Sequence, residues 1–302
     1  MRTLVKNQLR ADIPQQANRS GIVRTAVILR KIYIYDDEEW KMMNKKIVIQ
    51  FMVLTFIIML FFWGGLVICG QLGITLDKYP VLYVPQFIGA WSPAIASFIV
   101  LRKNKEVSGI KEWLKNIFTV KTSVFNYLFV VALLVILMVS LVMTSGLVRA
   151  EPLYMFFVWM LASVLYGAGM EEAGWRYILH AELDKKLGYI VTCLIIAPIH
   201  VLWHVPLWLS LENGSLGVRS FFSAIIIFGG AFSIGAIHKI SRGNIFLCLL
   251  FHCMINAGPS TIIPNQTISG AIITSLLMII VSIAAVSINK YRQQRNGTHM
   301  GV

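Results

Sequence analysis

The stretch "PLYMFFVWMLASVLYGAGMEEAGWRYILH", residues 152–180, decides the class of fold. Residues 152–170 contain no charged side chain, and a helix of that length crosses much of the roughly 30 Å hydrocarbon core of a bilayer. Glu171, Glu172 and Arg176 then follow within six positions. Ionisable groups at membrane depth are costly unless they face a protein interior or water. The stretch therefore predicts a membrane helix that carries a buried polar site.

The composition of the whole chain agrees with a membrane protein. The chain has 302 residues, of which 57% are hydrophobic and 14% charged, and its mean hydropathy is +0.71. Such values indicate an integral membrane protein. We predict an all-α, polytopic fold of about eight transmembrane helices, over residues 47–70, 82–101, 125–145, 152–181, 188–210, 220–238, 243–258 and 267–288.

The distribution of basic residues predicts how the chain crosses the membrane. Eight spans place both termini on one side, and 24 of the 27 Lys and Arg residues fall on that side. Since Lys and Arg favour cytoplasmic loops, we expect a multi-pass protein of the cell membrane with cytoplasmic termini. The same bias accounts for the net charge of +13 without a nucleic-acid partner. The expected parts are a basic N-terminal extension (1–46), a transmembrane domain (47–288) and a basic tail (289–302).

Three smaller features narrow the interpretation. The four cysteines lie in apolar runs without a paired spacing, so the sequence indicates neither a disulfide framework nor a thiolate metal site. Residues 1–46 lack the apolar core of a signal peptide. Residues 102–124, which include "GIKEWLKNIF", are either an amphipathic helix on the membrane face or an ordinary basic loop. We prefer the loop.

Polar residues interrupt the apolar runs at three places. Besides the acidic cluster, they are His200 and His204 in "PIHVLWHVPLW", and His252 with Asn256 in "LFHCMIN". Residues four apart share one face of a helix. His204 therefore lies one turn from His200, and Asn256 one turn from His252.

The same spacing separates the two glutamates. Glu172 can pair with Arg176 across one turn, whereas Glu171 points about 100° away and is left without a cation. Counting helical rise from the basic loops places all three polar clusters within the bilayer. We therefore expect them to meet in one cavity.

A buried glutamate beside histidines and an asparagine is suited to hydrolysis. The carboxylate can act as a general base on water. Histidine and asparagine can orient that water, bind a metal ion, or donate hydrogen bonds to an oxyanion on a carbonyl. Together they supply the groups needed to hydrolyse a peptide bond inside a membrane.

The three clusters resemble the motifs of a known family. "EEAGWR" is similar to the EExxxR motif, "HVLWH" to a motif of the [FW]xxxH type, and "HCMIN" to the HxxxN motif of the CAAX protease and bacteriocin-processing (CPBP or Abi) family of intramembrane proteases. The resemblance covers about residues 150–260, and "EEAGWRYIL" with "WHVPLW" resembles its bacterial branch. It implies a catalytic core of four helices.

The resemblance also implies a role for each residue. Glu171 would activate the water and His204 would help to place it. His252 and Asn256 would stabilise the oxyanion, while Glu172 and Arg176 would hold the geometry of the site. The family has been described as metalloproteases, but a metal-free, glutamate-dependent hydrolysis stays open beside zinc. If zinc is present, its candidate ligands are Glu171, His204 and His252.

The sequence departs from the family pattern at two positions. His200 stands where the second motif usually begins with Phe or Trp, and Tyr177 stands where Gly commonly follows the arginine. His200 is either an additional ligand or a hydrogen-bond partner of a neighbouring carbonyl, and we prefer the carbonyl. Tyr177 removes a close-packing position and so bears on helix contact rather than on the catalytic groups.

Two classes of function remain. The first is an intramembrane endopeptidase that cleaves a peptide or a lipidated protein C-terminus, as the resemblance to CAAX prenyl endopeptidases implies. The second is a non-hydrolytic membrane protein, either a peptide-immunity or scaffold protein or a proton-coupled transporter. Many transporters are built from two symmetry-related halves. The motifs of this chain show no such symmetry. We therefore favour the endopeptidase.

Overall fold

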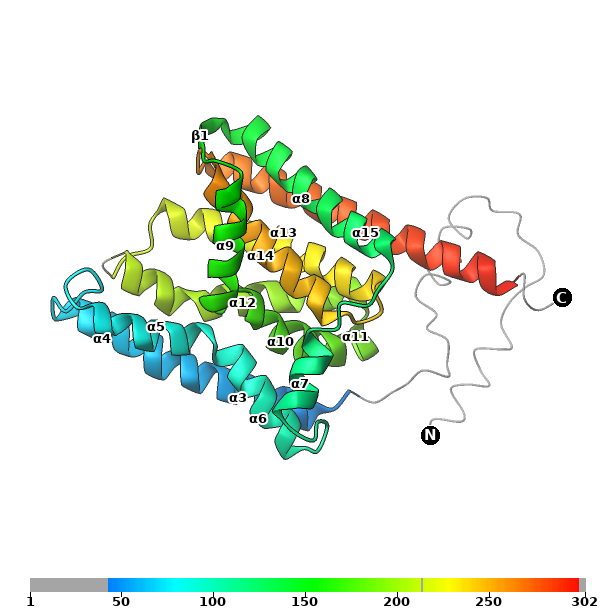
Figure 1. Ribbon diagram of the computed structural model, residues 1–302, viewed down its shortest axis with the longest axis horizontal. Helices are drawn as coiled ribbons and strands as arrows, with labels where there is room; N and C mark the ends of the chain where they lie inside the picture. The colour runs from blue at the N-terminus through cyan, green and yellow to red at the C-terminus, as the bar shows by residue number, and fades with distance from the viewer. Residues whose placement is uncertain (1–42, 213, 299–302) are drawn as a thin grey trace, which may run out of the picture. The chain divides into compact units, whose positions relative to one another are not determined.

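The fold is known from a computed structural model that describes residues 43–212 and 214–298. Most of the predicted extension, residues 1–42, lies outside the described residues. The described chain is almost entirely helical, as predicted (Figure 1). Its longer helices are α3 (Lys45–Met59), α4 (Gly65–Gln71), α5 (Tyr83–Ala90), α6 (Ser92–Lys103), α7 (Ile110–Ile117), α8 (Val124–Ser145), α9 (Tyr154–Leu165), α11 (Ala181–Leu187), α12 (Tyr189–Leu211), α13 (Val218–Ile240), α14 (Ile245–Thr261) and α15 (Ile268–Thr298).

Shorter turns and two strands complete the fold. The π-helix η1 (Leu60–Gly64) joins α3 to α4, and the 3-10 turn η2 (Pro80–Leu82) precedes α5. Strands β1 (Leu147–Ala150) and β2 (Ile262–Pro264) pair antiparallel and were not expected from the sequence. The motif stretch forms the 3-10 turn η3 (Gly169–Glu171), the single helical turn α10 (Glu172–Gly174) and the π-helix η4 (Trp175–His180).

The predicted spans form helices at the expected places. Five helices are long and apolar enough to cross a membrane, and two bent helix pairs raise the number to seven. The remaining expected span is α14, an apolar helix of 17 residues. The five long helices are Lys45–Gln71, Val124–Ser145, Tyr189–Leu211, Val218–Ile240 and Ile268–Arg295. The chain is therefore an all-α polytopic membrane protein.

Two expected spans are bent rather than continuous. The pair Pro80–Ala90 and Ser92–Lys103 bends by 46°, and the pair Tyr154–Leu165 and Gly169–Leu187 by 45°. The second break contains Gly167, whose φ is +89°. A Cβ at this glycine would also lie 2.7 Å from the Trp91 ring, so both the backbone angle and the contact require glycine there.

The two larger of three hydrophobic clusters organise the helices, and the first of them includes apolar residues of the motif stretch. One cluster joins α3 and α6 to the turns around Trp175, and the other joins α8, α13, α14 and α15. Figure 1 shows α8 beside α15 at one side of the described bundle, with α3 and α6 at the other and α12 and α14 between them. The apolar residues of the motif stretch thus lie within a packed core.

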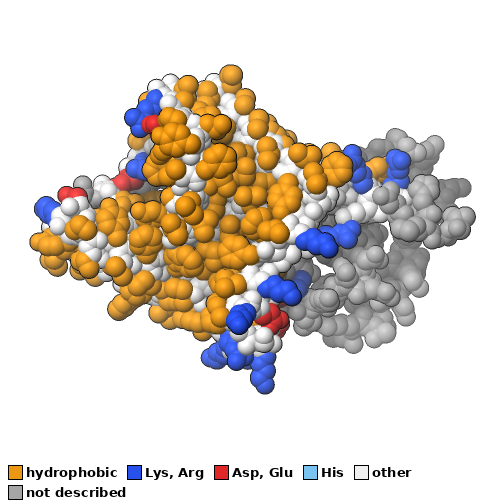
Figure 2. Space-filling model, in the orientation of Figure 1, with side chains coloured by type: hydrophobic (Ala, Val, Ile, Leu, Met, Phe, Trp, Pro, Cys, Tyr) orange, Lys and Arg blue, Asp and Glu red, His pale blue; other side chains and the backbone are white. Residues whose placement is uncertain are grey.

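The outer surface of the bundle suits a bilayer. Figure 2 shows hydrophobic side chains over most of the visible face, with Lys and Arg gathered toward its ends. Large apolar side chains that would be costly in water are exposed there, such as Phe61 (75%), Met143 (80%) and Leu153 (76%). An apolar exterior of this extent is expected where lipid is the solvent.

The segment 102–124 contains a helix and not only the expected basic loop. Helix α7 buries Trp113 and Ile117 in the core. Trp113 donates from Nε1 to Ser97 Oγ at 3.2 Å. Asn116 Nδ2 donates to Tyr177 Oη at 2.8 Å. The tyrosine that replaces the family's glycine therefore connects the motif stretch to α7.

The C-terminal tail also differs from the expectation. The predicted last span ends at residue 288, but α15 continues without a break to Thr298. The first ten residues of the predicted tail are therefore helical. The apolar run ends near Asn289, so the prediction detected the end of the hydrophobic surface and not the end of the helix.

Candidate active site

The motif stretch is a distorted helix that turns its polar side chains inward. It passes from a 3-10 turn through one α-turn into a π-helix between Gly169 and His180. Such irregular turns are common at functional sites. At Gly169 a Cβ would lie 2.5 Å from Cys253 Sγ on α14. The missing side chain lets the stretch approach α14 closely, which brings Glu172 to His252.

Glu172 lies at the centre of a buried polar network. Its Oε2 is 3.1 Å from Arg176 Nε, as the spacing predicted, and its Oε1 is 2.6 Å from His252 Nδ1. The side chains of Glu172 and Arg176 are both 0% exposed. Arg176 makes the ion pair without an aligned hydrogen bond, and its two Nη atoms have no hydrogen-bond partner among the described residues. The pair therefore depends on charge attraction in a dry interior.

Glu171 has a partner that the sequence did not predict. Its Oε2 lies 2.8 Å from His200 Nε2, and both residues are buried. When Glu171 is ionised and no metal is bound, its carboxylate only accepts, and Nε2 of His200 then carries the hydrogen. The expectation that His200 bonds a neighbouring carbonyl is therefore wrong. Glu171 is free of a cationic partner, as expected, but it is held by a histidine.

The hydrogen bond to a carbonyl is made by His204 instead. Its Nδ1 lies 3.0 Å from the backbone oxygen of His200. Because a carbonyl only accepts, Nδ1 of His204 carries the hydrogen, and Nε2 of the neutral ring has a free lone pair. That atom can accept a hydrogen bond from water or bind a metal ion.

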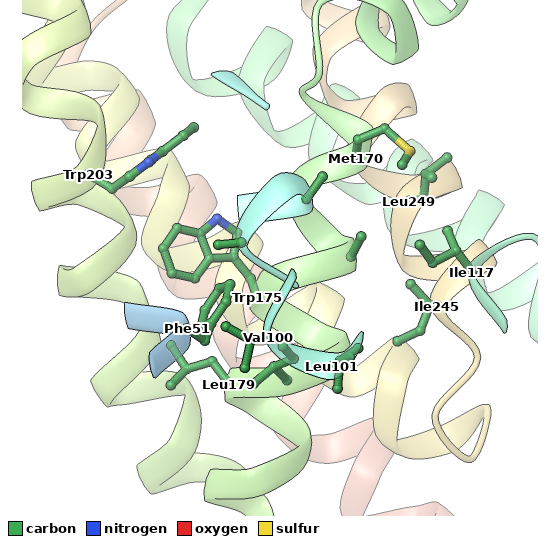
Figure 3. Packing of buried hydrophobic residues seen from close by; sticks show 14 of the residues in the cluster. Phe51, Val100, Leu101, Ile117, Met170, Trp175, Leu179, Trp203, Ile245 and Leu249 are labelled. Atoms are coloured by element: carbon green, nitrogen blue, oxygen red, sulfur yellow. The ribbon is translucent and has the colours of Figure 1, made fainter. Parts of the chain in front are cut away.

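Aromatic rings enclose the histidines. The ring of His200 lies 5.3 Å from Trp175 and 5.8 Å from Trp203, and His204 stacks on Trp208 at 5.4 Å. Trp175 packs edge-on against Phe51 at 5.6 Å, and Figure 3 shows these two rings together. The indoles fix the imidazoles and keep the surroundings apolar. The sequence alone predicts no role for these tryptophans, because aromatic residues are common in any membrane helix.

The fourth expected member, Asn256, is not part of the buried network. It lies on α14 one turn from His252, as predicted, but is exposed. The described residues make no side-chain hydrogen bond with it, since only its backbone oxygen accepts, from Ser260 Oγ. Its amide is therefore free to meet a ligand.

Geometry changes the set of possible metal ligands. Donor atoms of Glu171, His200 and His204 all lie within 4.8 Å of one another, which makes them the candidate metal cluster of the described residues. The expected set contained His252 in place of His200; this cluster does not include His252, whose Nδ1 is engaged by Glu172. One carboxylate and two imidazoles are the kind and number of ligands found in catalytic zinc sites. The donor set therefore fits zinc.

Comparison with known families agrees with the motifs. Residues 153–258 match the family described as Type II CAAX prenyl endopeptidase Rce1-like. This region contains all three motifs, so the resemblance to the CAAX protease family is confirmed over this part of the chain, whereas the bacterial branch stays a prediction. No curated protein sequence matches the chain. The match supports a protease, and the apolar helices indicate that it is a multi-pass membrane protein.

Proposed function

We propose that the protein is an intramembrane endopeptidase in which Glu171 activates the attacking water. The contact between Glu171 and His200 carries the proposal, because it holds a buried carboxylate in one orientation through Oε2. Glu171 takes a proton from water as the water oxygen attacks the scissile carbonyl carbon. The same proton then passes to the leaving amine, so the bond to nitrogen breaks without net loss of a proton.

The remaining residues position the reactants. His204 Nε2 accepts a hydrogen bond from the water, because its Nδ1 hydrogen is committed to the backbone. Asn256 donates its amide hydrogens to the oxyanion. His252 donates from Nε2 only as the imidazolium, because its Nδ1 hydrogen faces Glu172. Glu172 and Arg176 hold this histidine in place and do not touch the substrate.

Zinc is compatible with this arrangement. Glu171, His200 and His204 would hold the ion, and zinc would supply a Lewis acid that polarises a carbonyl and activates water. In either case the chain's own residues exclude bulk water, fix the imidazoles and place the carboxylate. The CAAX protease family implies a peptide or protein C-terminus as the substrate, and a lipidated cysteine near that end would place it beside the bilayer.

The test compares one buried and one exposed carboxylate. We expect Glu171→Gln, purified in detergent, to cleave a fluorogenic peptide at least 100-fold more slowly than the parent, since general bases contribute about 10²–10⁴-fold. Glu106→Gln is the matched control, because Glu106 is exposed on the basic segment. The peptide is assayed with and without a prenylated cysteine near its C-terminus. Equal turnover by the parent and Glu171→Gln, or binding of the peptide without cleavage, would contradict the proposal.

A further inference from the structure

A polar cavity lies away from the candidate active site. Its volume is about 420 Å³, and it forms where the start of α8, the end of α13 and the distal part of α15 meet. The lining side chains include Thr122, Asn126, Arg242, Asn289 and Arg292. We call this cavity the basic pocket. None of these residues belongs to the network around Glu171 and Glu172.

The positive charge of the basic pocket is not balanced within the described chain. Arg242 and Arg292 form no ion pair with a described residue. The sequence contains no Asp or Glu in residues 113–150 and none after Glu212. Asp184 pairs with Lys239, three residues before Arg242, at 2.6 Å. Two guanidinium groups therefore face the basic pocket without a counter-charge from residues 43–212 or 214–298.

Neutral donors in the basic pocket are also available to an anion. Asn126 Nδ2 donates to Thr122 Oγ1 at 2.7 Å, which leaves the Thr122 hydroxyl hydrogen free to donate elsewhere. The 22-residue helix α8 begins beside these groups; Ser123 caps its first turn by accepting from Phe125 N, and the positive end of the helix dipole still favours negative charge nearby. Guanidinium groups, a hydroxyl and a helix N-terminus together form the usual surroundings of a phosphate.

The helices that line the basic pocket also expose apolar side chains, which favours a lipid as the source of the phosphate. Phe125 is 80% exposed and Leu128 57% on α8, while Ile288 is 54% and Tyr291 65% exposed on α15. Exposed aliphatic and aromatic side chains next to arginines mark the boundary between hydrocarbon and headgroups. Figure 2 shows this change from hydrophobic to basic side chains toward the end of the described bundle where α15 lies. A ligand of the basic pocket would thus have acyl chains beside its phosphate.

We propose that the basic pocket binds the phosphate headgroup of an anionic phospholipid. Arg242 and Arg292 hold the phosphate oxygens, the Thr122 hydroxyl donates a further hydrogen bond, and the acyl chains lie along the apolar surfaces of α8 and α15. The inference is independent of the peptidase chemistry. A lipid bound in this way would connect α8, α13 and α15 at one face of the membrane.

Lipid-dependent stability of the purified, full-length protein tests the basic pocket. The thermal midpoint is measured in detergent against rising phosphatidylglycerol, with phosphatidylcholine and inorganic phosphate as parallel titrations. We expect phosphatidylglycerol alone to raise the midpoint, and the variant Arg242→Gln/Arg292→Gln to require about 25-fold more of it, at about 1 kcal/mol for each charge. Arg102→Gln/Lys103→Gln removes two exposed charges from α6 and should keep the parent's response.

The outcomes separate the basic pocket from general electrostatics. An unchanged response of the Arg242/Arg292 variant, or an equal loss in the α6 control, overturns the proposal. So does a rise of the midpoint with phosphatidylcholine, while a rise with inorganic phosphate would assign the cavity to a soluble anion instead. If the double variant does not fold, Arg292→Gln and Arg292→Lys are compared, and only the lysine variant should keep the lipid response.

Discussion

Glu171 and His200 lie 29 residues apart on different helices, and their Oε2 and Nε2 atoms are 2.8 Å apart in the bundle interior. The contact fixes which oxygen of the glutamate is engaged. The second imidazole is held separately, since His204 Nδ1 hydrogen-bonds to the backbone oxygen of His200 one turn away. A residue type that departs from the family motif is therefore the direct neighbour of the candidate base.

The first prediction concerns His200 as a positioning residue. His200→Phe removes the hydrogen bond to Glu171 while keeping an aromatic ring, as the family pattern has there. We expect kcat to fall about 10- to 100-fold with little change in KM, which is the usual cost of losing an orienting partner. His200→Gln, whose amide can still donate, should recover part of the loss.

A double-variant cycle isolates the contact between Glu171 and His200. In the Glu171→Gln background, His200→Phe should cause little further loss, because the carboxylate that it orients is already absent. Independent, multiplicative losses in the two variants would show that His200 acts by a route other than Glu171.

The second prediction concerns the buried ion pair. Arg176→Met leaves the charge of Glu172 uncompensated in a dry interior. We therefore expect the free energy of unfolding to fall by about 3–5 kcal/mol. Glu172→Gln/Arg176→Met removes both charges and should recover much of that loss. Thermal and denaturant unfolding in detergent measure both, and the prediction is wrong if the double variant is less stable than Arg176→Met.

The third prediction separates two sets of metal ligands. If zinc binds, Glu171, His200 and His204 hold it, because their donor atoms cluster within 4.8 Å. Metal analysis of purified protein should then show zinc lost from His204→Ala and retained in His252→Ala. Equal loss of zinc in both variants would support the ligand set predicted from the sequence, which includes His252. Zinc retained in both variants would show that it does not bind at this site.

The fourth prediction concerns helix α7. Trp113 is buried, bonds Ser97 and packs edge-on against Phe98 at 5.7 Å. Trp113→Ala should cost about 3–5 kcal/mol, the usual range for truncating a buried aromatic residue. We expect the segment 104–123 to become sensitive to limited proteolysis. Lys111→Ala, on the exposed face of the same helix, should leave the cleavage pattern unchanged.

Helix positions and the Glu172–Arg176 pair could be predicted because both depend on local spacing. An apolar run of membrane length forms a helix in lipid, because its backbone groups must hydrogen-bond within the segment. Residues four apart then lie on one face of that helix. The predicted spans therefore agree with the structure to within a few residues in most cases. Breaks inside spans were missed, because Gly167 acts through a contact with Trp91 that is distant in sequence.

The partners of the two glutamates could not be predicted, because they depend on how three helices are rotated about their axes. Rotation is set by close approaches such as that of Gly169 to Cys253, which the motif spacing does not report. His252 was expected beside Glu171 and instead bonds Glu172. The π-helical turns of η4 also prevented this prediction, because a regular period of 3.6 residues does not give the direction of side chains in a π-helix.

The short ladder between β1 and β2 has a mechanical consequence. It ties the chain just before α9 to the chain just after α14, and Glu151 N donates to Thr261 O at 2.7 Å beside it. Sliding of α14 along α9 would break these hydrogen bonds together. The ladder therefore anchors the start of α9 to the end of α14, and we expect these two helices to move together.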